Sequence, residues 1–360
     1  MRPEPCLAAD ASRELLEPLV RTFDRAFRLG LPGVGTEHLL FALLKGESAA
    51  IGVLAPKAGA KGALMGVIAG KGPDHWLSAD GGAGTPAPEA AALLREAEWS
   101  ARERREARGK DDRPGVPPSG ALAAAVDRAL RAARELGVGR AGPAHLLMGL
   151  LHDPGNRASE ALLERGLGRE EVLARLAVHP SAREEGTPHA PAVDGLRNMG
   201  LLTGRGKYWG GLAAKLAGGG LGSPVVPSVR LEADRQAARL GHPDVTTVHL
   251  LVAMLVLDEQ LAASGDRLRD GLLRFNGAAA LLRERGVTSA AVAAAAATAG
   301  GGPAWRAVTR ARLLSKERGD ASTGTVHLLA ALLDDPDDPC GPLLASAGVD
   351  TAELRRTLAV

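Results

Sequence analysis

The 360-residue sequence predicts an all-α protein, because helical signals recur along the chain and strand signals are nearly absent. A His-Leu-Leu tripeptide opens an apolar helical run four times, and a glycine stands eight residues before each of these anchor histidines. Glycine at such a position is typical of the end of a preceding helix. Alternating polar and apolar residues, as in strands, are scarce. The histidines are His38, His145, His249 and His327, and the glycines are Gly30, Gly137, Gly241 and Gly319.

Each of the four copies predicts a unit of helix, turn, helix, loop, helix, turn and helix. An amphipathic segment rich in Ala and Arg forms the first helix, and the His-Leu-Leu run forms the second. A shorter apolar run forms the third, and it is expected to stop at a further glycine. These glycines are Gly59, Gly166, Gly286 and Gly348. In the fourth copy we expect helices over residues 305–318, 326–333 and 342–347 and one to the C-terminus, with Thr325 as N-cap of the second.

The spacing of the copies predicts two domains of two repeats each. The last two copies stand almost back to back, whereas an insertion at residues 72–118, with a charged helix over about 88–108, separates the first two. A stretch rich in proline and glycine, residues 181–227, follows the second copy and is predicted to be a linker. The expected domains are therefore residues 10–180 and 228–360.

Composition and charge argue against several classes of protein. Lys plus Arg number 44 and Asp plus Glu 42, so the net charge of +2 argues against a dedicated nucleic-acid-binding protein. Two cysteines, one near each end, form no disulfide framework and fit a reducing cytoplasm. The N-terminus has no apolar signal-peptide core, and no run of about 18 apolar residues would span a bilayer. We therefore expect a cytoplasmic protein without a membrane segment.

The segment RAFRLGLPGVGTEHLLFALLKGESAAIGVL of the first copy resembles the repeat of the Clp N-terminal domain. This domain is the substrate- and adaptor-binding module of Clp-type AAA+ unfoldases, and the resemblance is greatest to the C type. It covers residues 12–71 of the first copy, whereas the other three copies share the helix pattern and the His-Leu-Leu. The resemblance implies paired four-helix repeats that bind proteins.

Similar unfoldases continue into ATPase modules, but this chain has no G-x-x-x-x-G-K-[ST] loop. The nearest match, Gly204 to Tyr208, lacks the upstream glycine and has tyrosine where the Mg²⁺-binding hydroxyl residue should stand. We therefore expect no ATP hydrolysis by this route and no enzyme activity.

Thr36 and Glu37 are the candidate ligand-binding residues. The resemblance implies that they contribute to a pocket for phosphorylated arginine, in which the carboxylate pairs with the guanidinium. The other copies have lost this carboxylate, because Ala144, Val248 and Val326 stand at the equivalent position. A structural alternative stays open, with Thr36 as a helix N-cap and Glu37 as a first-turn carboxylate that interacts with the helix dipole.

The anchor histidines allow a metal-binding or a structural interpretation. They lie in separate copies, and non-ligand residues stand three and four positions after each. We expect each to fill a structural role, with a ring nitrogen bonded to a nearby backbone group. The carboxylates near Cys340 would raise its thiol pKa, which disfavours a nucleophile. The acidic run at residues 334–338 is expected to be a solvated loop, and we expect no metal, no cofactor and no catalytic residue.

The sequence therefore predicts a non-catalytic binding protein of the Clp proteolysis system, acting as an adaptor or a decoy. The expected partners are Clp ATPase or protease components, their substrates and adaptors, and peptide-like small molecules such as antibiotics directed at N-domains. The alternative is a nucleic-acid-associated regulator that uses a basic and aromatic stretch of the linker. That stretch comprises Arg197, Arg205, Lys207, Tyr208, Trp209 and Lys215.

Overall fold

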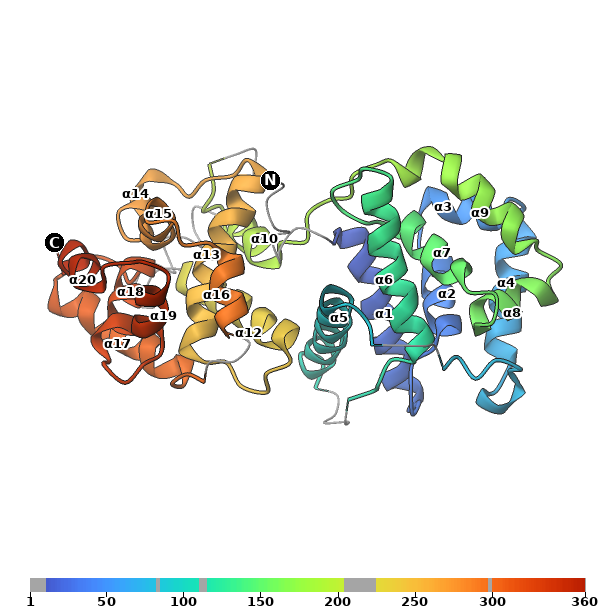
Figure 1. Ribbon diagram of the computed structural model, residues 1–360, viewed down its shortest axis with the longest axis horizontal. Coiled ribbons are helices and arrows are strands. Elements are labelled where there is room, and N and C mark those ends of the chain that lie inside the picture. The colour runs from blue at the N-terminus through green and yellow to red at the C-terminus, as the bar shows by residue number, and fades with distance from the viewer. Residues whose placement is uncertain (1–10, 82–84, 110–114, 204–224, 297–299, 360) are drawn as a thin grey trace. The chain divides into compact units, whose positions relative to one another are not determined.

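The computed structural model describes residues 11–81, 85–109, 115–203, 225–296 and 300–359, which are mostly helical (Figure 1). In this part of the chain β-structure is limited to isolated bridges, so the predicted all-α fold class is confirmed. The chain divides into two compact units, the first ending at His189 and the second beginning at Ala190. Each unit has its own apolar core.

The first unit contains two four-helix repeats with one further α-helix between them. Its helices are α1 (Arg13–Leu29), α2 (Thr36–Lys45), α3 (Ala49–Leu54), α4 (Ala58–Gly70), η1 (Pro73–His75), α5 (Pro88–Glu106), α6 (Gly120–Glu135), α7 (Pro143–His152), α8 (Arg157–Glu164), α9 (Arg169–Val178) and η2 (Pro180–Ala182).

The second unit also contains two repeats, and the short helix α10 precedes them among the described residues. Its helices are α10 (Pro191–Asn198), α12 (Val225–Leu240), α13 (Thr247–Ser264), α14 (Asp270–Leu273), α15 (Ala278–Glu284), α16 (Ser289–Ala296), α17 (Ala304–Glu317), α18 (Thr325–Asp334), α19 (Cys340–Ser346) and α20 (Thr351–Ala359). The third repeat differs from the others, because its α13 is longer and α14 is inserted before α15.

Glycines in the left-handed region end the first helix of every repeat. Gly30, for example, has φ 65°, and its N–H donates to carbonyl groups of the last turn of α1. Residues with a Cβ adopt this conformation at a cost, which explains the recurrence of glycine. Three of the four later glycines end the third helix in the same way. Gly59 does not, because α3 already ends at Leu54 and Gly59 lies inside α4.

The charged helix of the insertion, α5, forms part of the core of the first unit. It packs against α1 and α6, and its Leu93, Leu94 and Ala97 are buried. The guanidinium of Arg104 contacts Glu17 of α1 at 2.7 Å. The helix therefore pairs its charges with a neighbouring helix as well as along its own surface.

The boundary between the two units differs from the predicted linker at residues 181–227. Ala182 of η2 is fully buried in the first unit, and Pro188 forms a backbone bridge with Ser12, just before α1. In contrast, α10 packs in the second unit, where Leu196 is fully buried. A segment rich in proline and glycine can pack against the core of a domain or connect two domains, and its composition alone does not distinguish the two cases. Residues 204–224 of the predicted linker lie outside the described residues.

One described helix, α13, is long and apolar enough to cross a membrane by length and composition alone. Its 18-residue window has a mean hydropathy of 1.3, and 72% of that window is buried. The helix packs against α12, α15 and α16 in the core of the second unit. This packing accounts for its apolar character.

Two short backbone bridges join the repeats of the first unit at equivalent places. Val34, before α2, pairs with Pro118, before α6, and Ala11, before α1, pairs with Ala141, before α7. Each bridge brings the start of the second helix of one repeat beside the start of the first helix of the other. Two grooves of the first unit lie at these junctions.

Candidate functional site

In all four repeats the anchor histidine accepts a hydrogen bond at the start of its helix. Its Nδ1 accepts from the backbone N–H three residues earlier, at 2.9–3.1 Å. The ring nitrogen thus satisfies the backbone N–H of the N-cap residue. In three repeats the N-cap residue is a glycine, which has no side chain that could cap the helix. The donors are the N–H groups of Gly35, Gly142, Thr246 and Gly324. Gly35 and Gly324 are thus the N-cap residues, one position before the expected Thr36 and Thr325.

The second ring nitrogen meets polar partners in the second unit. His249 Nε2 lies 2.8 Å from His242 Nδ1, and His327 Nε2 lies 2.8 Å from Asp320 Oδ2. Burial lowers the pKa of His249 and of His38 to about 4, so both rings are neutral at neutral pH. Within the described ranges, no three His, Cys, Asp or Glu residues are grouped so that they could hold a metal ion.

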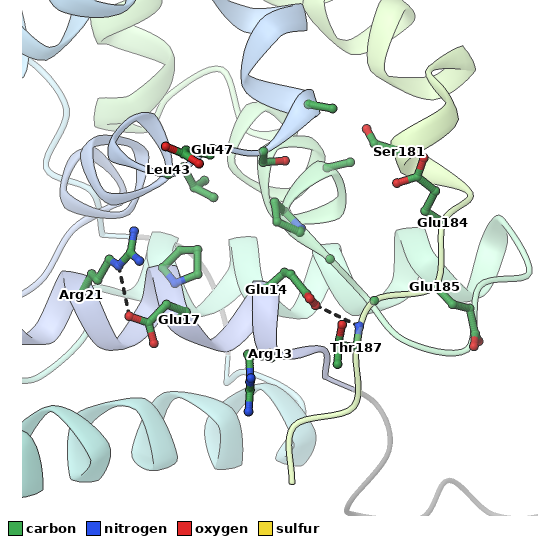
Figure 2. A pocket seen from close by; sticks show the side chains of 18 residues that line it. Arg13, Glu14, Glu17, Arg21, Leu43, Glu47, Ser181, Glu184, Glu185 and Thr187 are labelled. Atoms are coloured by element: carbon green, nitrogen blue, oxygen red, sulfur yellow. Dashed lines mark hydrogen bonds and ion pairs between the residues drawn. The ribbon is translucent and has the colours of Figure 1, made fainter. Parts of the chain in front are cut away.

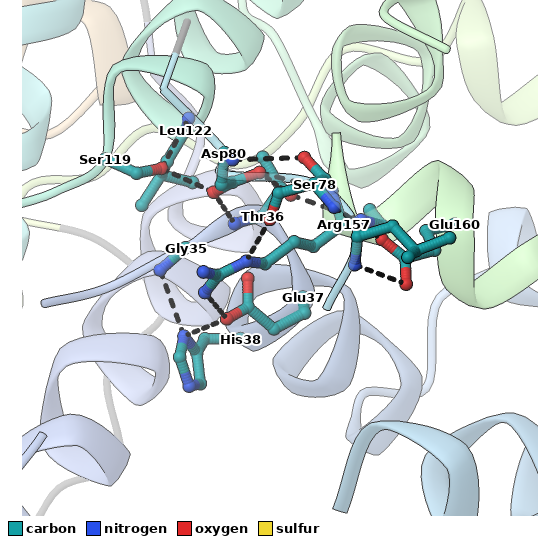
Figure 3. Close-up of polar contacts among 12 residues, drawn as sticks. Gly35, Thr36, Glu37, His38, Ser78, Asp80, Ser119, Leu122, Arg157 and Glu160 are labelled. Carbon is teal, nitrogen blue, oxygen red and sulfur yellow. Dashed lines mark hydrogen bonds and ion pairs between the residues drawn. The ribbon is translucent and has the colours of Figure 1, made fainter. Parts of the chain in front are cut away.

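At the first repeat, the carboxylate of Asp80 accepts four hydrogen bonds (Figure 3). Its Oδ1 accepts from the Thr36 hydroxyl at 2.6 Å and from the Arg157 backbone N–H at 3.2 Å. Its Oδ2 accepts from the Thr36 backbone N–H at 2.8 Å and from the Ser119 hydroxyl at 2.6 Å. The donors lie at the starts of α2, α6 and α8, and together they form an oxyanion cradle. Asp80 itself is only 3% exposed.

The two hydroxyl groups of the cradle are oriented by second hydrogen bonds. Thr36 Oγ1 accepts from the Ala158 N–H at 3.2 Å, and Ser119 Oγ accepts from the Leu122 N–H at 3.1 Å as the N-cap of α6. Each hydroxyl therefore directs its own hydrogen toward Asp80. Asp80 has φ 54°, a left-handed conformation that aspartate tolerates better than most residues with a side chain.

Glu37 lies beside the cradle and is also buried. Its Oε1 accepts from the Arg157 guanidinium at 3.0 Å and lies 3.3 Å from His38 Nδ1, whereas its Oε2 has no hydrogen-bond partner among the described residues. Burial, and then the negative charge of Asp80, raise the pKa of Glu37 above its ordinary value. The structure thus brings the two predicted residues, Thr36 and Glu37, together with Asp80 and Arg157, which sequence reasoning missed.

A groove of about 460 Å³ opens beside these residues. Apolar side chains from three parts of the first unit line it, including Leu31, Ile68 and Trp76. Its polar lining includes Glu37, Asp80 and Ser119 together with Arg25, Lys71 and Arg157. We call it the Glu37 groove. It combines an apolar wall with one buried carboxylate oxygen, Glu37 Oε2, for which the described residues provide no donor.

The equivalent starts of other helices also border grooves, without the Glu37 carboxylate. At the start of α7, where Ala144 replaces Glu37, a groove of about 490 Å³ is lined by several glutamates (Figure 2). One of them, Glu14, accepts from the Thr187 backbone N–H at 3.0 Å. At the start of α13, a groove of about 340 Å³ is lined by Thr247 together with arginines and aspartates.

Cys340 is buried at the start of α19. Burial and the nearby Asp338 raise the pKa of its thiol, so it stays protonated and is unsuited to act as a nucleophile. Asp338 belongs to the acidic run that was expected to be solvated, yet it is only 5% exposed. Its carboxylate accepts from the Cys340 backbone N–H at 2.9 Å, which explains why it is buried.

The fold and these grooves define a binding module built from four-helix repeats. Compared with protein families, residues 302–360, which form the fourth repeat, match the Clp repeat (R) N-terminal domain, and no ATPase-related family matches. The resemblance drawn mainly from the first copy is thus confirmed, although the matched segment is the fourth. A search of curated proteins found no match. Domains of this family mediate interactions with Clp-system proteins or their substrates, so the chain carries a Clp-related protein-interaction module.

Proposed function

We propose that this protein is a non-catalytic, cytoplasmic binding protein of the Clp proteolysis system. As an adaptor it would deliver clients to a Clp machine. As a decoy it would compete for substrates, adaptors or peptide antibiotics that otherwise engage an unfoldase N-domain. The observation that carries the proposal is the Glu37 groove, in a unit whose repeats share the anchor geometry of the matched fourth repeat.

The chemistry of this groove suits a peptide segment. Its apolar wall offers the contacts from which most of the binding free energy arises, and a buried hydrogen-bond acceptor would fix the orientation of the bound segment. The acceptor is Glu37 Oε2, which lacks a donor among the described residues. A basic side chain of a bound segment would supply that donor and relieve the cost of a buried, unsatisfied oxygen.

The role can be tested by the degradation of a fluorescent client with the host's own Clp unfoldase and peptidase. An adaptor raises the degradation rate when full-length protein is added, whereas a decoy lowers it with saturation. Capture of Clp subunits or clients on immobilised full-length protein should accompany either effect. An unchanged rate, with neither kind of protein captured, would contradict the proposal.

Two variants test whether the change in degradation rate depends on the Glu37 groove. Glu37→Gln keeps the shape of the side chain and removes its charge, and we expect it to weaken the effect on degradation about tenfold. Glu106→Gln, at an exposed position of α5, changes the net charge equally and should leave the effect intact. Equal effects of both variants would show that the Glu37 groove is not the binding surface.

The nucleic-acid alternative depends on a stretch that lies largely outside the described residues. The one described member is Arg197, whose guanidinium contacts Asp194 at 2.5 Å and Asp266 at 2.6 Å, so two carboxylates compensate its charge. The other members, at residues 205–215, are not described. Nuclease treatment before the capture separates the two functions, because recovery that vanishes with nuclease would favour the alternative.

A further inference from the structure

We propose that Asp80 determines the ligand class of the Glu37 groove, because its carboxylate fills the oxyanion cradle and leaves room only for an unphosphorylated basic side chain. The inference rests on the proposed function, in which this groove binds a peptide segment. It differs from the phosphoarginine pocket that the sequence resemblance implies, because here the place for an anion is occupied by the chain itself.

Asp80 uses all four donors that form the cradle. Asp80 takes two hydroxyl groups and two backbone N–H groups, at distances between 2.6 and 3.2 Å. Each hydroxyl, on Thr36 and Ser119, also accepts from a backbone N–H, so neither can turn its hydrogen elsewhere without losing a contact. A phosphoryl group would have to displace the Asp80 carboxylate and leave it buried without partners, which is costly.

Two carboxylates converge at Gly35, beside the cradle. A Cβ built on Gly35 would clash with both Glu37 Oε2 and Asp80 Oδ2, so these two oxygens take up the space beside Gly35 in which another residue would carry its side chain. Glu37 is 3% exposed, and its Oε2 has no partner among the described residues. A cation that reaches these oxygens from the Glu37 groove would interact with both carboxylates, whereas a further anion would be repelled by both.

Two of the three cations that line the groove are paired with carboxylates. The Arg157 guanidinium donates to Glu37 Oε1 at 3.0 Å and to the Ser78 carbonyl at 3.0 Å. The Lys71 ammonium is paired with two glutamates of α8. The third, the Arg25 guanidinium, lies over the Phe41 ring, 3.9 Å from its centroid, and its Nε has no hydrogen-bond partner among the described residues. Beside Gly35 it is Glu37 Oε2 that lacks a partner among the described residues, and this oxygen requires a hydrogen-bond donor.

The fourth repeat has equivalent hydrogen bonds at the start of its second helix, but a neutral asparagine takes the place of Asp80 as acceptor. Its Thr325 N–H donates to Asn276 Oδ1 at 3.0 Å, and the Ala278 N–H donates to Thr325 Oγ1 at 3.4 Å. Val326 stands where the first repeat has Glu37. The pair of converging carboxylates thus belongs to the first repeat, and it is the feature that selects a basic ligand there.

The test compares three synthetic peptides that differ at one position, which carries arginine, phosphoarginine or citrulline. Binding to the full chain is measured by titration calorimetry. We expect the arginine peptide to bind about tenfold or more tightly than the other two, because only it brings an unmasked cation. Tighter binding of the phosphoarginine peptide to the unaltered protein would overturn the proposal.

Two substitutions of Asp80 distinguish the effect of its negative charge from the effect of its side chain filling the cradle. Asp80→Gly opens the cradle, and glycine suits the φ of 54° at this position. It should reverse the preference, so that the phosphoarginine peptide binds more tightly than the arginine peptide. Asp80→Asn keeps the cradle filled but removes one carboxylate, so it should weaken the arginine peptide without favouring the phosphorylated one. Asp74→Asn, at an exposed position of the same segment, is the control for net charge.

Inorganic phosphate provides a readout that does not depend on peptide binding. At millimolar concentration it should raise the thermal midpoint of the Asp80→Gly protein and leave that of the unaltered protein unchanged. An unchanged midpoint in Asp80→Gly would overturn the assignment of the cradle. A shift confined to Asp80→Gly, with no peptide bound by the unaltered protein, would support the cradle and refute the proposed peptide binding at this groove.

Discussion

The hydrogen bond that each anchor histidine accepts at the start of its helix requires an unprotonated ring nitrogen. The histidine Nδ1 accepts from a backbone N–H, and a protonated ring could not accept that bond. Protonation would therefore remove the N-terminal contact of α2 or α13 and place a charge in the core. The cost of that charge is visible in the lowered pKa of His38 and His249.

This requirement predicts that acidification destabilises the fold. The folded-state pKa of about 4 for His38 and His249 lies below the ordinary value of 6.5, so the unfolded chain takes up these protons first. Stability is therefore lost as the pH falls from 6.5 through 4, by up to about 3–4 kcal/mol for each ring. Glu37 acts in the opposite sense, because its raised pKa adds stability as the pH falls toward 4.5.

Urea unfolding followed by circular dichroism between pH 7.5 and 4.5 measures this dependence. His249→Gln should flatten the profile, because it removes one of the two rings whose protonation opposes folding. Because Glu37 acts in the opposite sense, the decisive comparison is the variant: a His249→Gln profile that matches that of the unaltered protein would show that this ring titrates alike in both states.

A second prediction concerns Ser119, which caps α6 and also donates to Asp80. Ser119→Ala removes a cap and a hydrogen bond to a buried carboxylate, and we expect it to lower the free energy of unfolding by about 2–4 kcal/mol. Ser48→Ala removes a cap of α3 without a buried carboxylate and should cost about 1 kcal/mol. Equal losses in chemical denaturation would mean that the Ser119–Asp80 bond contributes nothing net.

The sequence pointed to only part of the candidate site. Thr36 and Glu37 stand in a motif next to an anchor histidine, and such local patterns can be recognised directly. Asp80 lies 44 residues from Thr36, and Arg157 lies 120 residues from Glu37. Neither stands in a distinctive motif, and their roles arise from the way the two repeats pack together. Single-sequence reasoning has no local signal for such contacts.

At the scale of elements, the crossing of α6 and α7 depends on Gly149. A Cβ added there would overlap the carbonyl oxygen of Ala125, in the backbone of α6. We expect Gly149→Ala to destabilise the protein by about 1–3 kcal/mol despite the better helix propensity of alanine. Gly66→Ala, in α4 with open space around it, should be neutral or stabilise by up to about 1 kcal/mol. Thermal unfolding of both variants measures the contrast.

Helices were predictable because their signals are local. Periodicity and terminal glycines place the helices of the fourth repeat close to where the structure has them. The departures also have local causes. In the first repeat α3 ends at Leu54, before the expected Gly59, and the histidine acceptor moves the N-cap of α2 to Gly35. Whether a proline-rich segment packs against a core depends on residues far away in the sequence. The packing of η2 in the first unit and of α10 in the second could therefore not be predicted from local patterns.

At the scale of the whole molecule, the two separate cores predict that the first unit folds on its own. A fragment of residues 1–189 should unfold cooperatively, with the helical content of its part of the full chain. A fragment of residues 1–180 should be less stable, because it lacks Ala182 and the Thr187 carbonyl that accepts from the Arg13 N–H at 2.8 Å. Equal unfolding midpoints for the two fragments would contradict this boundary.

The pairing of Glu37 with Arg157 across the two repeats also bears on how the protein is made. These residues are 120 positions apart, so at about 5–20 residues per second a ribosome adds Arg157 roughly 6–24 s after Glu37. During that interval the apolar faces that the first repeat later buries against α6 and α7 have no partner on the nascent chain. The Glu37 groove therefore cannot exist on a ribosome until the second repeat has emerged, and the growing chain needs protection from aggregation over that time.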